Sequence, residues 1–181
     1  MARNIEIKAR VDDLEALRRR VAALTPTPAT VLLQTDTFFV AASGRLKLRQ
    51  FSGGDGELIF YDRPDAPGPK ASSYIRSHAP EPATLSEILE RTLGLRGIVE
   101  KRREVFMVGR SRIHLDEVRG LGNFMEIEVV LDDGEDAAVG EQVAHEIMTA
   151  LEITETSLVA GAYVDLLHQP RGGEAGFRPQ R

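Results

Sequence analysis

The N-terminal segment alternates charged and apolar residues with a period of two. In an extended strand, residues 4–10 place Glu6, Lys8 and Arg10 on one face and only apolar side chains on the other. A carboxylate beside two cations is compatible with a solvated surface. It is equally compatible with the wall of a site that holds a metal ion and a polyanion.

Charged faces of the same kind recur in later strand-like segments. Residues 45–49 place three cations opposite two leucines, and His114 shares a face with Arg112 and Asp116. Glu126 and Glu128 lie two residues apart on another such face, and carboxylates at this spacing can hold Mg²⁺ or Mn²⁺ through hard oxygen ligands. The further cations on such segments are Arg63, Lys70, Arg76, Lys101 and Arg103.

Two architectures account for these faces, and the residues alone leave both open. In an open antiparallel sheet the charged face is simply solvated. In a closed barrel it points inward, where charges are costly unless they are paired and fully hydrogen-bonded. An interior rich in Arg and Lys with a few carboxylates suits a polyphosphate with divalent metals, because guanidinium and ammonium groups pair with phosphate oxygens.

Composition narrows the class of protein. The 181 residues suit one domain, with 42% hydrophobic and 28% charged residues. A net charge of -5 argues against general nucleic-acid binding. The chain has no cysteine, no signal-peptide pattern and no apolar run near the roughly 20 residues of a membrane span. We therefore expect a cytoplasmic protein without nucleic-acid or membrane partners.

Periodicity and turn residues predict an α+β fold: an antiparallel eight-stranded β-barrel or tunnel with helices packed outside. Residues 1–168 form this single domain, and residues 169–181 are expected to be a flexible tail. The strands are expected at about 3–11, 31–41, 45–52, 57–63, 71–79, 97–109, 111–118 and 123–132. Helices are expected at about 12–24, from Pro80-Glu81-Pro82 to the stop at Gly94, and at 136–151, with a short final helix near 155–168.

These segments resemble the CYTH superfamily, also called triphosphate tunnel metalloenzymes. The family signature is an N-terminal Glu-x-Glu-x-Lys strand, and the matching stretch here is Asn4-Ile5-Glu6-Ile7-Lys8. The similarity continues in order through residues 45–49, 61–64, 70, 74–76, 99–103, 114–118, 120–128 and 162–167. The ordered set is far more specific than any one of its elements.

The resemblance implies a charged tunnel, a triphosphate substrate and two divalent ions, Mg²⁺ or Mn²⁺. It implies metal ligands at Glu6, Asp116, Glu126 and Glu128. The implied phosphate contacts are Lys8, Arg45, Lys47, Arg49, Arg63, Lys70, Arg76, Lys101 and Arg103. Catalysis is expected from Lys8, Glu6, Glu126 and Glu128.

Among the branches of the family, the pattern is most similar to the class IV adenylate cyclases, which convert ATP to cyclic AMP and pyrophosphate. The alternatives are a triphosphatase acting on inorganic, thiamine or nucleoside triphosphate, and a non-catalytic protein that binds polyphosphate or nucleotide. A homodimer is compatible with the sequence, although no segment requires one.

Asn4 is the main departure from the family pattern. An amide oxygen is an uncharged and weaker ligand for Mg²⁺ than a carboxylate, so one metal site is expected to be weakened. Lys8 is interpreted as a phosphate contact or a general base. His114 is interpreted as a structural, hydrogen-bonding histidine.

Overall fold

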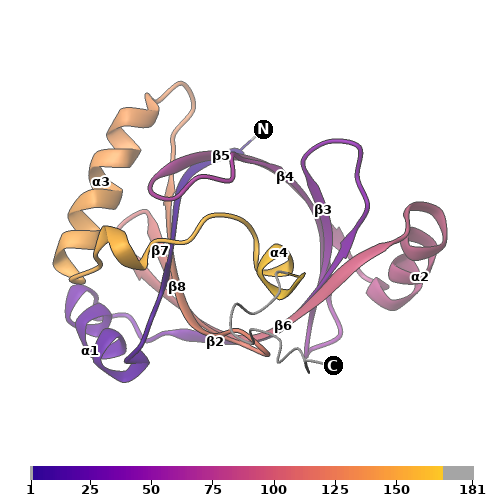
Figure 1. Ribbon diagram of the computed structural model, residues 1–181, viewed down its shortest axis with the longest axis horizontal. Coiled ribbons are helices and arrows are strands. Elements are labelled where there is room, and N and C mark those ends of the chain that lie inside the picture. Colours follow the sequence, from indigo (N-terminus) through magenta and orange to yellow (C-terminus); the bar gives the residue numbers. More distant parts are fainter. Residues whose placement is uncertain (1, 169–181) are drawn as a thin grey trace, which may run out of the picture.

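The strands form one closed antiparallel barrel in the computed structural model, which describes residues 2–168. Figure 1 looks into the ring, in which the strand order is β1-β5-β4-β3-β2-β6-β7-β8. The strands are β1 (Ala2–Arg10), β2 (Thr30–Phe39), β3 (Arg45–Phe51), β4 (Gly56–Asp62), β5 (Lys70–Ala79), β6 (Leu95–Val108), β7 (Ser111–Val118) and β8 (Gly122–Val130). The predicted fold class is confirmed, and the open-sheet alternative is wrong.

The period of two in the strands sorts their side chains between the inside and the outside of the barrel. Ile5 and Ile7 of β1 and Ile127 of β8 point outward and are fully buried in an apolar cluster. That cluster also contains Leu17 of α1 (Leu14–Leu24) and Ala144 of α3 (Ala137–Ala150). The hydrophobic core therefore lies between the barrel wall and its helices, and the charged faces are left to line the interior.

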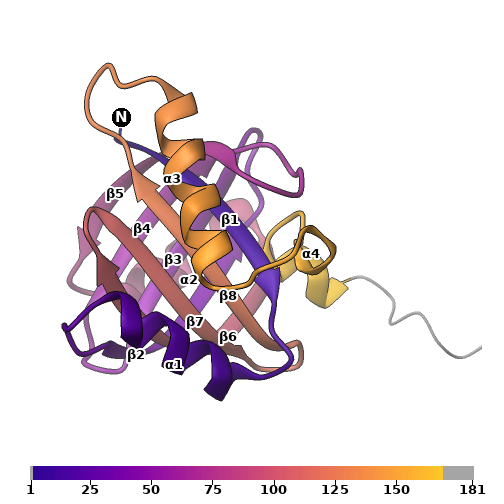
Figure 2. The same ribbon diagram turned by 90° about the vertical axis from the view of Figure 1, so that its left-hand side faces the viewer.

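The longer helices cover separate parts of the wall. Helices α1 and α3 pack over β1, β6, β7 and β8, while α2 (Pro82–Leu93) packs against β2 and β3 (Figures 1 and 2). The carboxylates of Asp13 and Asp136 accept hydrogen bonds from the first turns of α1 and α3, as N-cap residues do. No helix among residues 2–168 is long and apolar enough to cross a membrane.

The short final helix predicted near residues 155–168 is present, but only in the C-terminal part of that range. The segment consists of a short 3₁₀ turn (Glu155–Ser157), an extended stretch, and the short helix α4 (Tyr163–His168). Leu158 pairs with Ala9, and the Val159 amide donates to the Lys8 carbonyl, so this stretch extends the sheet beside β1. Gly161 then takes a positive φ of 81°, a conformation that suits glycine.

Helix α4 lies across one mouth of the barrel (Figure 1). It packs tightly on β6, since a Cβ atom at Gly97 would come within 2.7 Å of the Val164 side chain. The chain itself therefore lies over this mouth, which we call the closed mouth; the opposite one is called the open mouth. The tail predicted for residues 169–181 lies outside the described residues, so the domain boundary stays a prediction.

The outward position of the core predicts the stability of two isoleucine variants. Ile127→Ala should destabilise the protein by about 2–5 kcal/mol, because it removes a fully buried side chain and leaves a cavity. Ile98→Ala is the matched control, since Ile98 is 49% exposed on the same barrel and should change stability by no more than about 0.5 kcal/mol. Urea unfolding measures both, and equal losses would contradict this location of the core.

Candidate functional site

The barrel encloses a polar cavity of about 300 Å³ to which all eight strands contribute. Eight cationic and five carboxylate side chains line it, so positive charge is in excess. The charged lining residues are Glu6, Lys8, Asp36, Lys47, Arg49, Glu57, Arg63, Arg76, Lys101, Arg103, Arg112, Glu126 and Glu128. We refer to this cavity as the tunnel.

Two deeply buried aspartates hold four of the cations in place. Oδ2 of Asp36 lies 2.9 Å from Nζ of Lys47, and its Oδ1 accepts a 2.8 Å hydrogen bond from Nε of Arg49. Asp116 accepts two hydrogen bonds from Arg103 and forms an ion pair with Lys101. Because the aspartates are almost inaccessible to solvent, they act as fixed counter-charges that orient the cations.

Burial lowers the pKa of the tunnel lysines. Desolvation, followed by the nearby Arg49 charge, lowers the pKa of Lys47 from 10.5 to about 7. Burial lowers the pKa of Lys8 to about 8, although Glu126 opposes this shift. Near neutral pH these ammonium groups are held close to deprotonation, and an arriving anion would stabilise their charged forms.

All four lysines of the chain are buried or half-buried on the inward side of the barrel, whereas the cations on its outer surface are arginines. Lys8, Lys47 and Lys101 line the tunnel. Lys70 is buried beside it, and its ammonium group donates to the carbonyl of Ala66 in the loop before β5. Lysine is therefore reserved for the interior of this barrel.

A cluster of one imidazole and two carboxylates offers a place for a divalent cation. One potential ligand atom from each of His114, Glu126 and Glu128 lies within 4.8 Å of the others. The pKa of Glu126 is held well below its ordinary value, because Arg103 and Lys8 outweigh the effect of burial. Ionised carboxylate oxygens with one imidazole nitrogen are a donor set that suits Mn²⁺ and similar ions, so these residues fit the implied metal.

The other two predicted metal ligands have different partners. The carboxylate of Glu6 lies in the tunnel and accepts a 2.7 Å hydrogen bond from Arg63. Asp116 is fully buried and does not line the tunnel; besides Arg103, it accepts a 2.9 Å hydrogen bond from the hydroxyl of Tyr163. The geometry makes Asp116 a partner of tunnel cations.

Most of the predicted phosphate contacts meet in the tunnel, and two do not reach its lining. Arg45 pairs with Asp65 and Asp165 at the closed mouth, and Lys70 bonds the neighbouring loop. The contacts that the barrel brings together are Lys8, Lys47, Arg49, Arg63, Arg76, Lys101 and Arg103.

Sequence reasoning assigned no role in the site to several of its residues, among them Asp36, Glu57, Arg112 and Tyr163. Asp36 and Arg112 occupy inward positions on β2 and β7, and the alternation of polar residues in those segments was an available signal. Tyr163 reaches the tunnel only because the C-terminal segment folds over the mouth, and no local pattern predicts that contact. Nζ of Lys8 lies 3.9 Å from the centroid of the Tyr163 ring, a cation–π contact.

Polar contacts hold the C-terminal segment against the mouth of the tunnel that lies under α4. The Gly161 carbonyl accepts hydrogen bonds from Lys8 and Arg63, at 3.2 and 3.1 Å. Asp165 forms ion pairs with Arg45 and Arg96. These contacts hold the C-terminal segment over this end of the tunnel.

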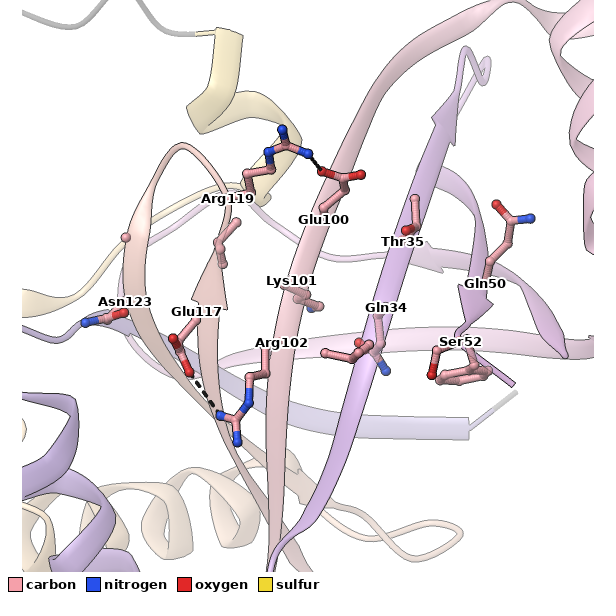
Figure 3. Close-up of a pocket in the computed structure, with 14 residues that line it drawn as sticks. Gln34, Thr35, Gln50, Ser52, Glu100, Lys101, Arg102, Glu117, Arg119 and Asn123 are labelled. Atoms are coloured by element: carbon pink, nitrogen blue, oxygen red, sulfur yellow. Dashed lines mark hydrogen bonds and ion pairs between the residues drawn. The ribbon is translucent and has the colours of Figure 1, made fainter. Parts of the chain in front are cut away.

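A second, larger hollow of about 510 Å³ lies on the outer wall (Figure 3). Its charged side chains pair with one another: Arg102 with Glu117, and Arg119 with Glu100. This hollow lacks a cluster of potential metal ligands of the kind found among the described tunnel residues. The tunnel is therefore the better candidate for the functional site.

Comparison with known proteins agrees with the barrel fold. The model of the CYTH domain family matches residues 2–163. Adenylate cyclase CyaB from Aeromonas hydrophila is 27% identical over 178 residues, covering 91% of this chain and 88% of that protein. The chain belongs to the CYTH domain family.

Solved structures share the fold at low sequence identity. The PH1012 protein from Pyrococcus horikoshii OT3 superposes with a TM-score of 0.81 at 20% identity, covering 91% of this chain and 99% of that one. HpAC1 from Hippeastrum, described as having a dominant triphosphatase activity, superposes with a TM-score of 0.62 at 18% identity, covering 91% and 94%. At these identities the likeness concerns the fold alone.

The lowered pKa of Lys47 predicts proton uptake when an anion binds. At pH 8, metal-free tripolyphosphate should bind with uptake of protons, because the anion raises lysine pKa values from about 7–8 toward their ordinary range. Lys47→Gln should take up fewer protons at pH 8, and its difference from wild type should vanish near pH 6, where Lys47 is already charged. Calorimetry in buffers of different ionisation enthalpy measures the uptake. Equal proton uptake by wild type and Lys47→Gln at pH 8 would contradict the lowered pKa of Lys47.

Proposed function

We propose that this protein is a divalent-metal-dependent enzyme that binds the triphosphate of a nucleotide in the tunnel and acts at the α-phosphorus, forming cyclic AMP and pyrophosphate from ATP. The observation that carries the proposal is the excess of oriented cations around the His114–Glu126–Glu128 cluster. A polyphosphate chain complements both features, since its oxygens pair with the cations and share a metal with the carboxylates.

The cations are oriented before a substrate arrives. Asp36 and Asp116 position Lys47, Arg49, Lys101 and Arg103 through the contacts already described. Groups held in this way stabilise developing charge without reorganising during the reaction. A divalent ion bound by the carboxylates would neutralise phosphate charge as the P–O bond breaks.

An apolar patch at the open mouth favours a nucleotide over inorganic tripolyphosphate. Leu32, Phe51 and Val105 line the tunnel on the neighbouring strands β2, β3 and β6. The end of the barrel under α4 is marked by Phe38 of β2 and Gly97 of β6, which both lie near Val164. Leu32 and Val105 lie on the same two strands but toward the opposite end. A purine ring stacked on Phe51 would bury apolar surface while its triphosphate extends inward.

This orientation favours reaction at the α-phosphorus. Asp116 of β7 contacts Tyr163 of α4, and His114 is the next inward residue of β7 away from α4. The cluster of His114, Glu126 and Glu128 therefore lies between the apolar patch and the closed mouth. The phosphate next to the ribose would lie at the cluster, where Nζ of Lys8 lies 3.3 Å from Oε1 of Glu126, and the further phosphates would extend toward Arg63. This position leaves Lys8 both of its expected roles, as a phosphate contact or as a general base. The relative named adenylate cyclase CyaB supports the same reaction.

Product analysis tests the proposal. Purified protein is incubated with ATP and with tripolyphosphate, each with Mg²⁺ or Mn²⁺, and the products are separated and quantified. Cyclic AMP with an equal amount of pyrophosphate is the expected result. Orthophosphate release without cyclic AMP would replace the cyclase with a triphosphatase, and binding without turnover would replace it with a binding protein.

Glu126→Gln should lower metal-dependent turnover by a factor of about 10² or more, because the amide replaces a charged carboxylate that would hold the divalent ion. Glu100→Gln is the matched control, because Glu100 lies on the outer wall and pairs with Arg119. Steady-state rates at saturating metal measure both variants, and full activity of Glu126→Gln would remove this carboxylate from the mechanism.

Phe51→Ala tests the nucleoside end of the tunnel. Loss of aromatic stacking, worth about 1–3 kcal/mol per base, should weaken ATP binding by about tenfold or more. Tripolyphosphate has no base, so its affinity should change little and serves as the internal control. Calorimetric titration measures both ligands, and a parallel loss for the two would show that Phe51 does not contact a base.

A further inference from the structure

His114 occupies an unusual position in the tunnel wall. It lies on the inward face of β7, directly opposite Glu126 of β8, and it is only 4% exposed. Its Nδ1 atom lies 3.5 Å from Oε2 of Glu126 and 3.7 Å from Oε1 of Glu128. The ring nitrogen therefore faces two carboxylates at once.

This nitrogen has no hydrogen-bond partner within the described part of the chain. A buried histidine with a purely structural role would normally have such a bond, because an unpaired buried polar atom loses its hydration without compensation. Histidine bound to a metal is the common alternative for an imidazole among carboxylates. The only acidic groups close to Nδ1 that the described residues supply are the carboxylates of Glu126 and Glu128, an arrangement that a shared cation would complete.

The carboxylates leave room for a further positive partner. Arg112 donates to Oε2 of Glu128, so that Oε1 is the oxygen facing the imidazole. Glu126 contacts Lys8 through Oε1 and Arg103 through Oε2, and each carboxylate oxygen can accept more than one interaction. An ion at the cluster would share oxygens with cations already in place.

The partners of the remaining acidic residues favour the same location. Glu6 is opposite Glu128 in the register of β1 and β8, but its carboxylate bonds Arg63. Asn4, further along β1, contributes only an uncharged amide, whose oxygen also has no hydrogen-bond partner among residues 2–168. The imidazole thus provides a third donor where β1 supplies no free carboxylate.

We propose that His114 is a metal ligand, and that with Glu126 and Glu128 it forms a mixed nitrogen–oxygen site that selects Mn²⁺ over Mg²⁺. Mg²⁺ binds almost entirely through oxygen and keeps its water, whereas first-row transition ions gain from an imidazole nitrogen. The inference rests on the proposed function only in taking the tunnel as the place where a divalent ion acts. It concerns the identity of that ion and its ligands.

Electron paramagnetic resonance of bound Mn²⁺ tests the ligand directly, without substrate or turnover. Wild-type protein with substoichiometric Mn²⁺ should show the coupling of a directly bonded ¹⁴N nucleus in pulsed spectra. His114→Ala should lose that coupling. His145→Ala is the matched control and should keep it, since His145 is exposed on α3 and its Nδ1 contacts the Glu141 carbonyl of its own helix.

Competition with Mg²⁺ tests the selectivity. The Mg²⁺ concentration that displaces half of the Mn²⁺ should fall by about tenfold in His114→Asn, which keeps an oxygen donor of similar reach. Circular dichroism and urea unfolding establish that the variants are folded. An unchanged ratio of affinities would overturn the selectivity.

Two results would overturn ligation by His114: bound Mn²⁺ in wild type without ¹⁴N coupling, or coupling that survives in His114→Ala. Metal-dependent product formation without ¹⁴N coupling would reject His114 as a ligand and leave the proposed function standing. Coupling without any product would reject the proposed function and leave the ligand assignment standing.

Discussion

A closed barrel with a charged interior depends on the pairing of its buried ions. Each desolvated ion costs several kcal/mol, which only close partners of opposite sign can offset. Asp36 and Asp116 meet this requirement, since each contacts two cations at the centre of the wall. The same pairs that allow the barrel to fold also fix the guanidinium and ammonium groups where an anion can use them. Stability and pre-organisation for phosphate therefore have one physical origin.

The period of two lets each strand serve two purposes. Outward isoleucines such as Ile5 and Ile127 build the core under α1 and α3, while inward neighbours such as Glu6 and Glu126 build the tunnel. The protein thus needs no separate core and active-site layers, and a domain of this size can hold many charges inside. The segment ending in α4 covers one mouth and so gives the tunnel a direction, with Ala162 and Tyr163 at its closed end and the apolar patch of Leu32, Phe51 and Val105 toward the other.

Much of this arrangement could be predicted from the sequence, because strand alternation is a local property. The strands and the charged faces at residues 45–49 and 126–128 followed from it. Barrel closure could not be derived from the residues alone, since a solvated sheet shows the same alternation. The expectation of a closed tunnel came from the resemblance to a family. The short helix expected near residues 155–168 occupies only Tyr163–His168, because Leu158 pairs with the end of β1, a tertiary contact without a local signature. The contacts of Tyr163 with the tunnel residues could not be predicted for the same reason.

The central claim is that the interior charges receive a triphosphate. A crystal structure with Mn²⁺ and an ATP analogue that resists cleavage at the α-phosphorus tests it most directly. The account predicts phosphate oxygens in contact with Lys47, Arg49 and Arg63, and the base beside Phe51 at the open mouth. Phosphates bound in the outer hollow of Figure 3, with the tunnel cations still paired only to their carboxylates, would contradict it.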